Sequence, residues 1–361
     1  MGVSVDVVAP RYWPADVAWR DGAVAVHPSY RRGDPRAPRS IVRSIESLDA
    51  RTVHVQHELF AFGGLRSAFA LPRALRGLRA SRRKVVTTIH GVIPLERITA
   101  EFCRANRIPA PAPIVRTVWR HLLRQVALAS DAVHVHEFEL ADLLRKQYGV
   151  HDRPIHVIPI GSGPHAKGPE RARARGFIRV PADAEVVLFF GYMSTYKGVA
   201  EFLEAMASAL PQRPRLHVVL AGDVPARLKG WLDLPAMIAR CGEHRDRIHA
   251  LGFIPTEDVE MVFAAADALV LPYTIVMAAS GAMSHAIAHG VPVLMSDRFK
   301  SAYPTAPGLF QPDASSIARA VCDFFERPAL RAQSMEFFRA LGTGRSWNSV
   351  AEKIASLYEA L

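Results

Sequence analysis

The sequence predicts an α/β protein with two doubly wound parallel sheets in tandem. Short β-rich runs alternate with helical stretches along the whole chain, a pattern typical of parallel strands joined by crossover helices. The length of 361 residues exceeds that of one usual hydrophobic core, so two domains are expected. The segment 161–176 is rich in Gly, Pro and charge and lacks an apolar face, which indicates a linker between the domains.

The first half opens differently from a usual doubly wound sheet. Such a sheet begins with a strand and a glycine-rich turn, but no such turn follows GVSVDVVAP at the start of this chain. This opening suggests that 4–9 is the second strand of its domain, with the first βα unit missing. The strands expected in this half are 4–9, 52–57, 85–90, 132–137 and 155–160, and the helices about 39–48, 64–81, 113–129 and 138–148.

The second half repeats the alternation with clearer punctuation. The strands expected there are 185–190, 215–222, 247–252, 267–272 and 292–296. The expected helices are 198–209, 224–241, 256–265, 281–289, 314–326 and 346–360.

Composition and charge narrow the class of protein. Half of the residues are hydrophobic and 22% are charged, which indicates a globular chain. Three widely spaced cysteines predict a reducing cytoplasm without a disulfide framework or a metal-ligand pair, and no secretory signal is visible. Residues 1–165 hold 24 Lys+Arg against 14 Asp+Glu, a surplus of 10 within the net charge of +11. A basic half favours an anionic partner, and the absence of nucleic-acid-binding motifs disfavours nucleic acid.

A stretch without charged residues lies between Asp267 and Asp297. Its length would allow a membrane helix, but Pro272 and a later Gly-Val-Pro punctuate it into strand, loop, helix and strand. The helix is expected to start at Ser280-Gly281, where free backbone N–H groups and the helix dipole suit a phosphate. An ordinary βαβ unit with Ser280 as a plain N-cap is the alternative.

A second phosphate-binding pattern follows the predicted strand 185–190. That strand runs into a loop from Gly191 to Gly198 that carries Lys197 just before the next helix. A glycine turn at the carboxyl end of a strand, with a lysine at the following helix start, is well placed for a phosphate. The spacing is not that of a P-loop, and a solvated lysine in a surface loop is the alternative.

The segment 65–84 has seven basic residues and no acidic ones. Leu65, Phe69, Leu71, Leu75 and Leu78 give it an apolar side, so an amphipathic helix on an anionic membrane is one interpretation. A crossover helix that packs on the sheet with solvated arginines is the other.

These segments resemble a known family. Four segments of the second half resemble the donor-binding half of a retaining glycosyltransferase of family 4, which has the two-Rossmann GT-B fold: FFGYMSTYKG, VVLAGD, LGFIPTEDVEMVFAAADALVLPY and SGAMSHAIAHGVPVLMSD. The acceptor-side strands of the family are resembled less specifically by four segments of the first half: TVHVQHELFAFGG, VVTTIHGVIP, DAVHVHEFELADLL and IHVIPIG. The segment GRSWNSVAEKIASLYEAL resembles the last helix of the family. The resemblance implies an acceptor-side domain at 1–165, a nucleotide-sugar domain at 166–340 facing it across a cleft, and a helix at 341–361 that crosses back.

The resemblance also implies roles for individual residues. Lys197 would hold the pyrophosphate, the amides of Ser280 and Gly281 would cap the distal phosphate or the sugar, and His90 would lie near the donor sugar. His57 and Glu58 would face the cleft from the neighbouring strand. The implied catalytic residues are His90, Glu58 and Lys197, and the implied nucleotide-sugar ligands are Gly191, Tyr192, Lys197, Phe253, Ser280, Gly281 and His285.

This chain departs from the family pattern at three positions. Two glutamates eight apart in much of the family are replaced by Met277 and His285, and an arginine is replaced by Tyr192. The chain resembles a branch that carries a Ser-Gly element instead of the acidic loop.

The expected activity is transfer of a hexose, with retention and without a metal, from a nucleoside-diphosphate sugar to a glycan, lipid-linked or small-molecule acceptor. The nucleotide sugar is a co-substrate, and no cofactor is expected. The alternatives are a nucleotide-sugar epimerase, a phosphorylase, or a catalytically impaired GT-B relative that acts as a binding partner or membrane adaptor. The expected location is cytoplasmic, with peripheral attachment to the inner membrane face through 65–84.

Overall fold

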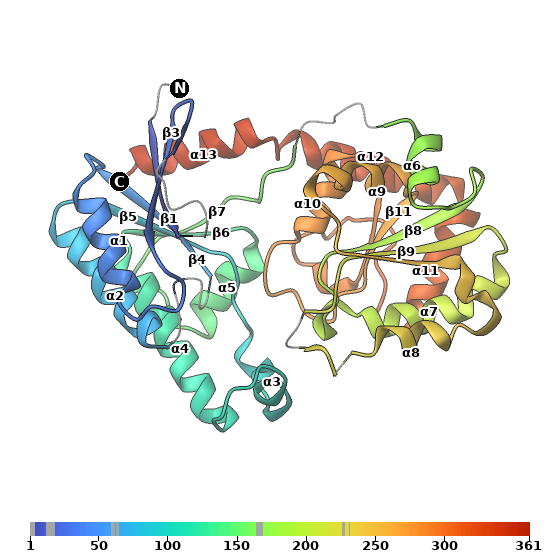
Figure 1. Ribbon diagram of the computed structural model, residues 1–361, viewed down its shortest axis with the longest axis horizontal. Coiled ribbons are helices and arrows are strands. Elements are labelled where there is room, and N and C mark those ends of the chain that lie inside the picture. The colour runs from blue at the N-terminus through green and yellow to red at the C-terminus, as the bar shows by residue number, and fades with distance from the viewer. Residues whose placement is uncertain are drawn as a thin grey trace. The chain divides into compact units, whose positions relative to one another are not determined.

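The computed structural model describes residues 4–11, 19–58, 62, 65–163, 169–225, 228–230 and 232–361. The chain divides into two compact units (Figure 1). Unit 1 comprises Met1–Ile158 and Lys353–Leu361, and unit 2 comprises Pro159–Glu352. Each unit contains a parallel sheet with helices packed on it, as the alternation of strands and helices predicts.

Unit 1 is built on a four-stranded parallel sheet of order β4-β5-β6-β7. The strands are β4 (Thr52–His57), β5 (Lys84–Ile89), β6 (Ala132–Val135) and β7 (Ile155–Val157). The longer connecting helices are α2 (Leu65–Ala80), α4 (Ala112–Ala129) and α5 (Phe138–Lys146). Shorter helices are η1 (Leu95–Arg97) and α3 (Ala100–Ala105). The apolar side chains of β5 and β6 are fully buried, as expected for central strands covered on both faces.

The start of unit 1 forms a separate three-stranded sheet of order β1-β3-β2. Its strands are β1 (Val5–Pro10), β2 (Trp19–Asp21) and β3 (Val24–Tyr30), and α1 (Ala37–Glu46) follows. The strand expected at 4–9 is present, and it pairs in parallel with β3. The strands β2 and β3 were not predicted from the sequence.

Unit 2 contains a five-stranded parallel sheet of order β10-β9-β8-β11-β12. The strands are β8 (Glu185–Phe190), β9 (Leu216–Ala221), β10 (Ile248–Gly252), β11 (Ala268–Leu271) and β12 (Val293–Met295). The α-helices are α6 (Arg171–Phe177), α7 (Val199–Gln212), α8 (Leu234–Ala239), α9 (Val259–Ala265), α10 (Gly281–Ala288), α11 (Ala314–Glu326) and α12 (Pro328–Thr343). The last helix, α13 (Trp347–Glu359), begins in unit 2 and continues into unit 1 after Glu352. Short 3-10 helices are η2 (Thr195–Lys197), η4 (Gly242–Arg247), η5 (Thr256–Asp258) and η6 (Asp297–Phe299).

The uncharged stretch forms β11, a loop, α10 and β12, as its punctuation predicts. Its side chains are largely buried in the main core of unit 2. None of the helices in the described part of the chain is long and apolar enough to cross a membrane.

Two predictions about unit 2 are wrong. The expected linker 161–176 includes most of α6, because the buried Ala174 and Arg175 fix that segment against the rest of unit 2 without an apolar stripe. Of the expected helix 224–241, the described residues form an α-helix at α8, and Pro225 and Gly230 interrupt the pattern before it. The helix α12 was not predicted.

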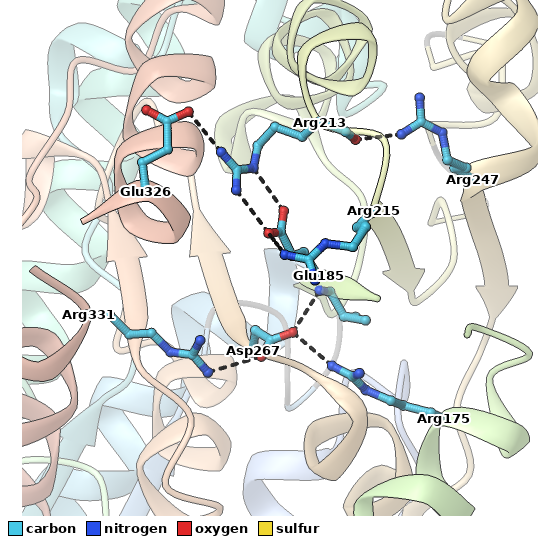
Figure 2. Close-up of polar contacts among 9 residues, drawn as sticks. Arg175, Glu185, Arg213, Arg215, Arg247, Asp267, Glu326 and Arg331 are labelled. Carbon is cyan, nitrogen blue, oxygen red and sulfur yellow. Dashed lines mark hydrogen bonds and ion pairs between the residues drawn. The ribbon is translucent and has the colours of Figure 1, made fainter. Parts of the chain in front are cut away.

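A network of ion pairs holds the amino ends of the strands of unit 2 (Figure 2). Asp267, only 6% exposed, accepts hydrogen bonds from Arg175 at 3.0 Å, from Arg331 at 3.2 Å and from the N–H of Val186 at 2.8 Å. It also pairs with Arg171. This network ties α6 and α12 to β8 and β11 at the edge of the sheet opposite the strands' carboxyl ends.

A second carboxylate extends the same edge. Glu185 accepts hydrogen bonds from Arg213 at 2.8 and 2.9 Å, and Arg213 also reaches Glu326 at 2.8 Å (Figure 2). These contacts join β8 to the end of α7 and to α11. The amino edge of the sheet is therefore occupied by structural ion pairs.

Candidate active site

The topology of unit 2 marks one place on its sheet for a ligand. From β8 the chain proceeds outward through β9 and β10, then returns to place β11 on the other side of β8. In open α/β sheets, ligands bind outside the carboxyl ends of the strands at the point where the strand order reverses. In unit 2 that point lies between β8 and β11, where the loop with Lys197 and the loop before α10 begin.

The loop after β8 is folded tightly against its neighbours. Gly191 and Gly198 have φ of 102° and 73°, which favour glycine. A Cβ on Gly198 would lie 2.0 Å from the carbonyl oxygen of Pro272, and one on Gly222 would lie 2.1 Å from that of Gly191. These close approaches require glycine, and they bring together the chain segments that follow β8, β9 and β11.

Lys197, at the end of η2, is a half-buried cation. A Cβ built on Gly191 would lie 2.8 Å from Nζ, so the ammonium lies directly beside the start of its own loop. Burial lowers the pKa of Lys197 from 10.5 to about 8. No carboxylate in the described ranges forms an ion pair with Nζ. Its positive charge therefore remains available for an anionic ligand.

The helix α10 begins at the predicted place. Oγ of the buried Ser280 accepts a hydrogen bond from the N–H of Met283 at 3.2 Å, so this residue is an N-cap. The cap leaves the N–H groups of Gly281 and Ala282 without an intrahelical partner, as in the first turn of any α-helix. Gly281 is exposed. Capping and anion binding are compatible here because they use different N–H groups.

Tyr273 lies between these two elements. Its hydroxyl oxygen is 3.3 Å from Oγ of Ser280, and Nζ of Lys197 lies 5.8 Å from the centroid of its ring. Burial raises the pKa of the phenol. This residue was not predicted from the sequence, because no periodicity or spacing indicates that a side chain after β11 reaches both Lys197 and the helix start.

Three further residues of unit 2 were predicted to bind the nucleotide sugar: Tyr192, Phe253 and His285. Tyr192 follows β8 and Phe253 follows β10, and both side chains are exposed. His285 is on α10 with its ring 5.6 Å from the rings of Phe263 and Phe190. Its partial burial lowers the pKa of the imidazole, so the ring is neutral near pH 7. Among the described residues, no hydrogen bond, ion pair or ring contact joins these three side chains to Lys197 or Tyr273.

In unit 1, His90 follows β5 and is held through both ring nitrogens. Nε2 lies 2.9 Å from Oε1 of Gln56, and Nδ1 lies 3.1 Å from Nε2 of His136. Burial lowers its pKa, which favours the neutral ring. His57 is buried at the end of β4 with a pKa lowered to about 4, whereas Glu58 is exposed. The His57 carbonyl accepts the N–H of His90 at 3.1 Å.

A further chain of hydrogen bonds in unit 1 runs from Tyr358 to the carbonyl of Ile158. The successive links are Tyr358 Oη to His54 Nδ1 at 2.6 Å, His54 Nε2 to Thr88 Oγ1 at 2.6 Å, Thr88 Oγ1 to His134 Nδ1 at 2.7 Å, and His134 Nε2 to Ile158 O at 2.8 Å. The carbonyl can only accept, so each donor points towards Ile158 and both histidines are neutral with hydrogen on Nε2. Burial lowers both histidine pKa values to about 4, in agreement with this arrangement. This series of hydrogen bonds was not predicted from the sequence.

The two halves of the chain match two family models. Residues 1–162 match Glycosyltransferase Family 4, and residues 184–327 match Glycosyl transferases group 1. The chain is therefore a glycosyltransferase-like protein of the GT-B fold. Among solved structures of this fold, Anabaena HepE in complex with UDP and glucose has a TM-score of 0.71 at 18% identity, covering 94% of this chain and 86% of that one. Sucrose-phosphate synthase from Thermosynechococcus elongatus has a TM-score of 0.69 at 20% identity, covering 99% and 88%.

Curated relatives are similar over part of their length. D-inositol 3-phosphate glycosyltransferase of Kineococcus radiotolerans is 27% identical over 69% of this chain and 61% of the relative. The protein of the same name from Streptomyces coelicolor is 26% identical over 69% and 59%. 2-Deoxystreptamine glucosyltransferase of Streptomyces kanamyceticus is 26% identical over 65% and 59%. The chain thus spans about three fifths of the length of these relatives.

Proposed function

We propose that this chain is a retaining glycosyltransferase that moves a hexose from a nucleoside-diphosphate sugar to a glycan, lipid-linked or small-molecule acceptor without a metal ion. The observation that carries this proposal is the arrangement around Tyr273. There, Lys197 and the capped start of α10 both lie at the reversal point of the sheet of unit 2, and no carboxylate of the described residues pairs with Lys197. The matches of both halves of the chain to glycosyltransferase families support it.

The chemistry follows from where charge develops. Departure of the nucleoside diphosphate places negative charge on its distal phosphate while the sugar acquires oxocarbenium character. Preorganised donors aimed at that phosphate lower the barrier. Lys197 and the free N–H groups of Gly281 and Ala282 supply such donors, and the helix dipole of α10 adds to them. The sequence contains no Asp-x-Asp motif that would hold a metal at the phosphates.

For retention, we propose that the leaving phosphate itself accepts the proton of the acceptor hydroxyl. His90 then serves as a neutral, oriented ring beside the donor sugar, fixed by Gln56 and His136. Glu58, exposed after β4, is the proposed partner of the reacting sugars on the acceptor side. His285 replaces a carboxylate at the nucleoside, so we expect it to contact the ribose as a neutral hydrogen-bonding group.

Two comparisons support particular substrates. Anabaena HepE was solved with UDP and glucose, which supports a UDP-sugar donor. The names of the relatives specify D-inositol 3-phosphate and 2-deoxystreptamine as acceptors, which supports a small hydroxyl-bearing ring among the proposed acceptor classes.

A donor-binding experiment tests the proposal. UDP-, GDP- and dTDP-sugars are added to the protein and the melting temperature is measured, followed by an assay of donor hydrolysis and transfer. We expect one donor to raise the melting temperature, and Lys197→Ala to abolish that shift and lower kcat/KM by about 100-fold to 1,000-fold. Lys146→Ala removes an exposed lysine of unit 1 and is the matched control, expected to retain the shift.

The outcomes separate the alternatives. Failure of every donor to shift the melting temperature would contradict the glycosyltransferase proposal. Donor binding with no turnover for any acceptor would instead indicate a catalytically impaired relative. Conversion of the sugar without any acceptor would indicate an epimerase.

We also propose that the start of α2 contacts an anionic membrane at its inner, cytoplasmic face. Leu71, Leu75 and Leu78 are buried in the core of unit 1, whereas Leu65 and Phe69 are 56% and 52% exposed. Exposed apolar side chains beside arginines suit the boundary of an anionic bilayer. We expect co-sedimentation with phosphatidylglycerol vesicles that Leu65→Ser with Phe69→Ser reduces several-fold. Equal binding of both proteins, or binding to neutral vesicles alone, would contradict this.

A further inference from the structure

Tyr273 is buried, and both its ring and its backbone are held by neighbouring residues. It is 5% exposed, and its ring lies 6.0 Å from that of Tyr196 and 5.3 Å from that of Phe299. Its carbonyl oxygen accepts the hydroxyl of Ser296 at 2.6 Å. The next residue, Thr274, donates its N–H to the carbonyl of Tyr196 at 2.9 Å. The backbone of the loop after β11 is thus joined directly to the loop that carries Lys197.

We propose that Tyr273 is a positioning residue that holds Lys197 and Ser280 so that both face the same diphosphate. This inference rests on the proposed function and assigns a role to a side chain that contacts Lys197 and the N-cap of α10. The ring orients the ammonium from one side, and the hydroxyl orients the N-cap from the other.

The ring is a partner that leaves the charge of Lys197 intact. A carboxylate beside Nζ would orient the ammonium but neutralise it, whereas an aromatic face within about 6 Å attracts a cation without cancelling its charge. The loop that carries Tyr273 has no charged residue between Asp267 and Asp297. The full positive charge therefore acts on the ligand, which favours a diphosphate over a singly charged anion.

The hydroxyl of Tyr273 leaves the hydroxyl hydrogen of Ser280 free to be donated. Oγ of Ser280 has two lone pairs and one hydrogen. One lone pair accepts the N–H of Met283, and the other can accept the O–H of Tyr273 at 3.3 Å. The hydrogen of Ser280 is then free for a phosphate oxygen. The distance of 3.3 Å is longer than that of a strong O–H···O bond, so we expect this contact to shorten when an anion is bound.

Two substitutions separate the ring from the hydroxyl. We expect Tyr273→Phe to raise the Kd for UDP, measured by titration calorimetry, by about 3-fold to 10-fold through loss of one hydrogen bond. Tyr273→Leu also removes the ring, and the loss should reach about 30-fold to 100-fold. Tyr148→Phe is the matched control: its buried hydroxyl donates to Ile93 in unit 1, so it should lower the melting temperature and leave the Kd for UDP unchanged.

A double-mutant cycle tests whether the hydroxyl acts through Ser280. If it does, Tyr273→Phe should cost little further affinity in a Ser280→Ala background. Additive losses would show that the hydroxyl acts elsewhere and would overturn this part of the proposal. The cycle needs only two conservative variants, so it remains decisive even if Tyr273→Leu does not fold.

The pH profile provides a readout that a purely structural role would not move. In the unsubstituted protein, affinity for UDP should fall as pH rises through the lowered pKa of Lys197. Opening the site to water in Tyr273→Leu should move that midpoint upward, and Tyr273→Phe should leave it in place. If the unsubstituted protein binds no nucleoside diphosphate, the proposed function fails. If it binds and both variants bind equally well, the positioning role alone fails.

Discussion

At the scale of single residues, Asp267, at the start of the uncharged stretch, stabilises the fold of unit 2. Asp267 neutralises Arg175, which is itself buried, and it also bonds the N–H of Val186. Its pairs with Arg171 and Arg331 contribute less, because those arginine side chains are 47% and 43% exposed. The carboxylate is therefore needed chiefly so that Arg175 is not left as an uncompensated charge in the interior.

We expect Asp267→Asn to destabilise unit 2 by about 3 to 5 kcal/mol, the usual cost of leaving one partner of a buried ion pair alone. The measurement is urea unfolding followed with a probe in unit 2. Asp142→Asn is the matched control, since it breaks exposed pairs with Lys146 and Arg145 and should change stability by about 0.5 kcal/mol or less. Equal effects of the two substitutions would contradict the role assigned to Asp267.

At the scale of elements, the sequence predicts what periodicity and turn residues encode. The strands of both parallel sheets and helices such as α4, α10 and α11 follow from apolar spacing and from Gly, Pro and Ser at their ends. The helix α6 could not be predicted in this way. Its sequence RARARGF has no apolar stripe, and it is held by arginines paired with a carboxylate that is distant in sequence.

The candidate site divides in the same way. Lys197 and Ser280 stand next to a strand end or a helix start, so local pattern finds them. Tyr273 and the chain from Tyr358 to Ile158 depend on contacts between side chains from separate segments, for which a single sequence gives no distance. The predicted domain boundary lies at 165, whereas unit 1 ends at Ile158. The difference arises because the segment from Pro159 to Gly163 packs within unit 2, where the N–H of Ser162 donates to the carbonyl of Arg345 at 2.7 Å.

At the scale of the whole molecule, the chain passes between its units twice, after Ile158 and before Lys353. The hydrogen-bond chain through His54, Thr88 and His134 begins at Tyr358, just beyond the second passage, and ends on the carbonyl of Ile158, at the first. Both passages are thus tied to the centre of the four-stranded sheet of unit 1. This arrangement requires neutral histidines, so it makes the attachment of the last helical turns sensitive to acid.

The sign of that sensitivity follows from the pKa values. His54 and His134 have folded-state pKa values lowered to about 4 from 6.5, by burial and by the neighbouring His90 and His136. The unfolded chain binds protons that the folded chain cannot, so their contribution to stability is full above pH 6.5 and is lost as pH falls towards about 4.

Tyr358→Phe tests this attachment. The variant leaves Nδ1 of His54 without its donor, which should cost about 1 to 3 kcal/mol at pH 7. Nδ1 can then take a proton in the folded state, so the variant should lose less stability on acidification. We expect urea unfolding of unit 1 at pH 7, 6 and 5 to show that the free energies of unfolding of the unsubstituted protein and of Tyr358→Phe approach each other as the pH falls. The hydroxyl of Tyr148 donates to the carbonyl of Ile93, so Tyr148→Phe should show a constant difference in the free energy of unfolding. A constant difference for Tyr358→Phe would contradict the proposed direction of the hydrogen bonds.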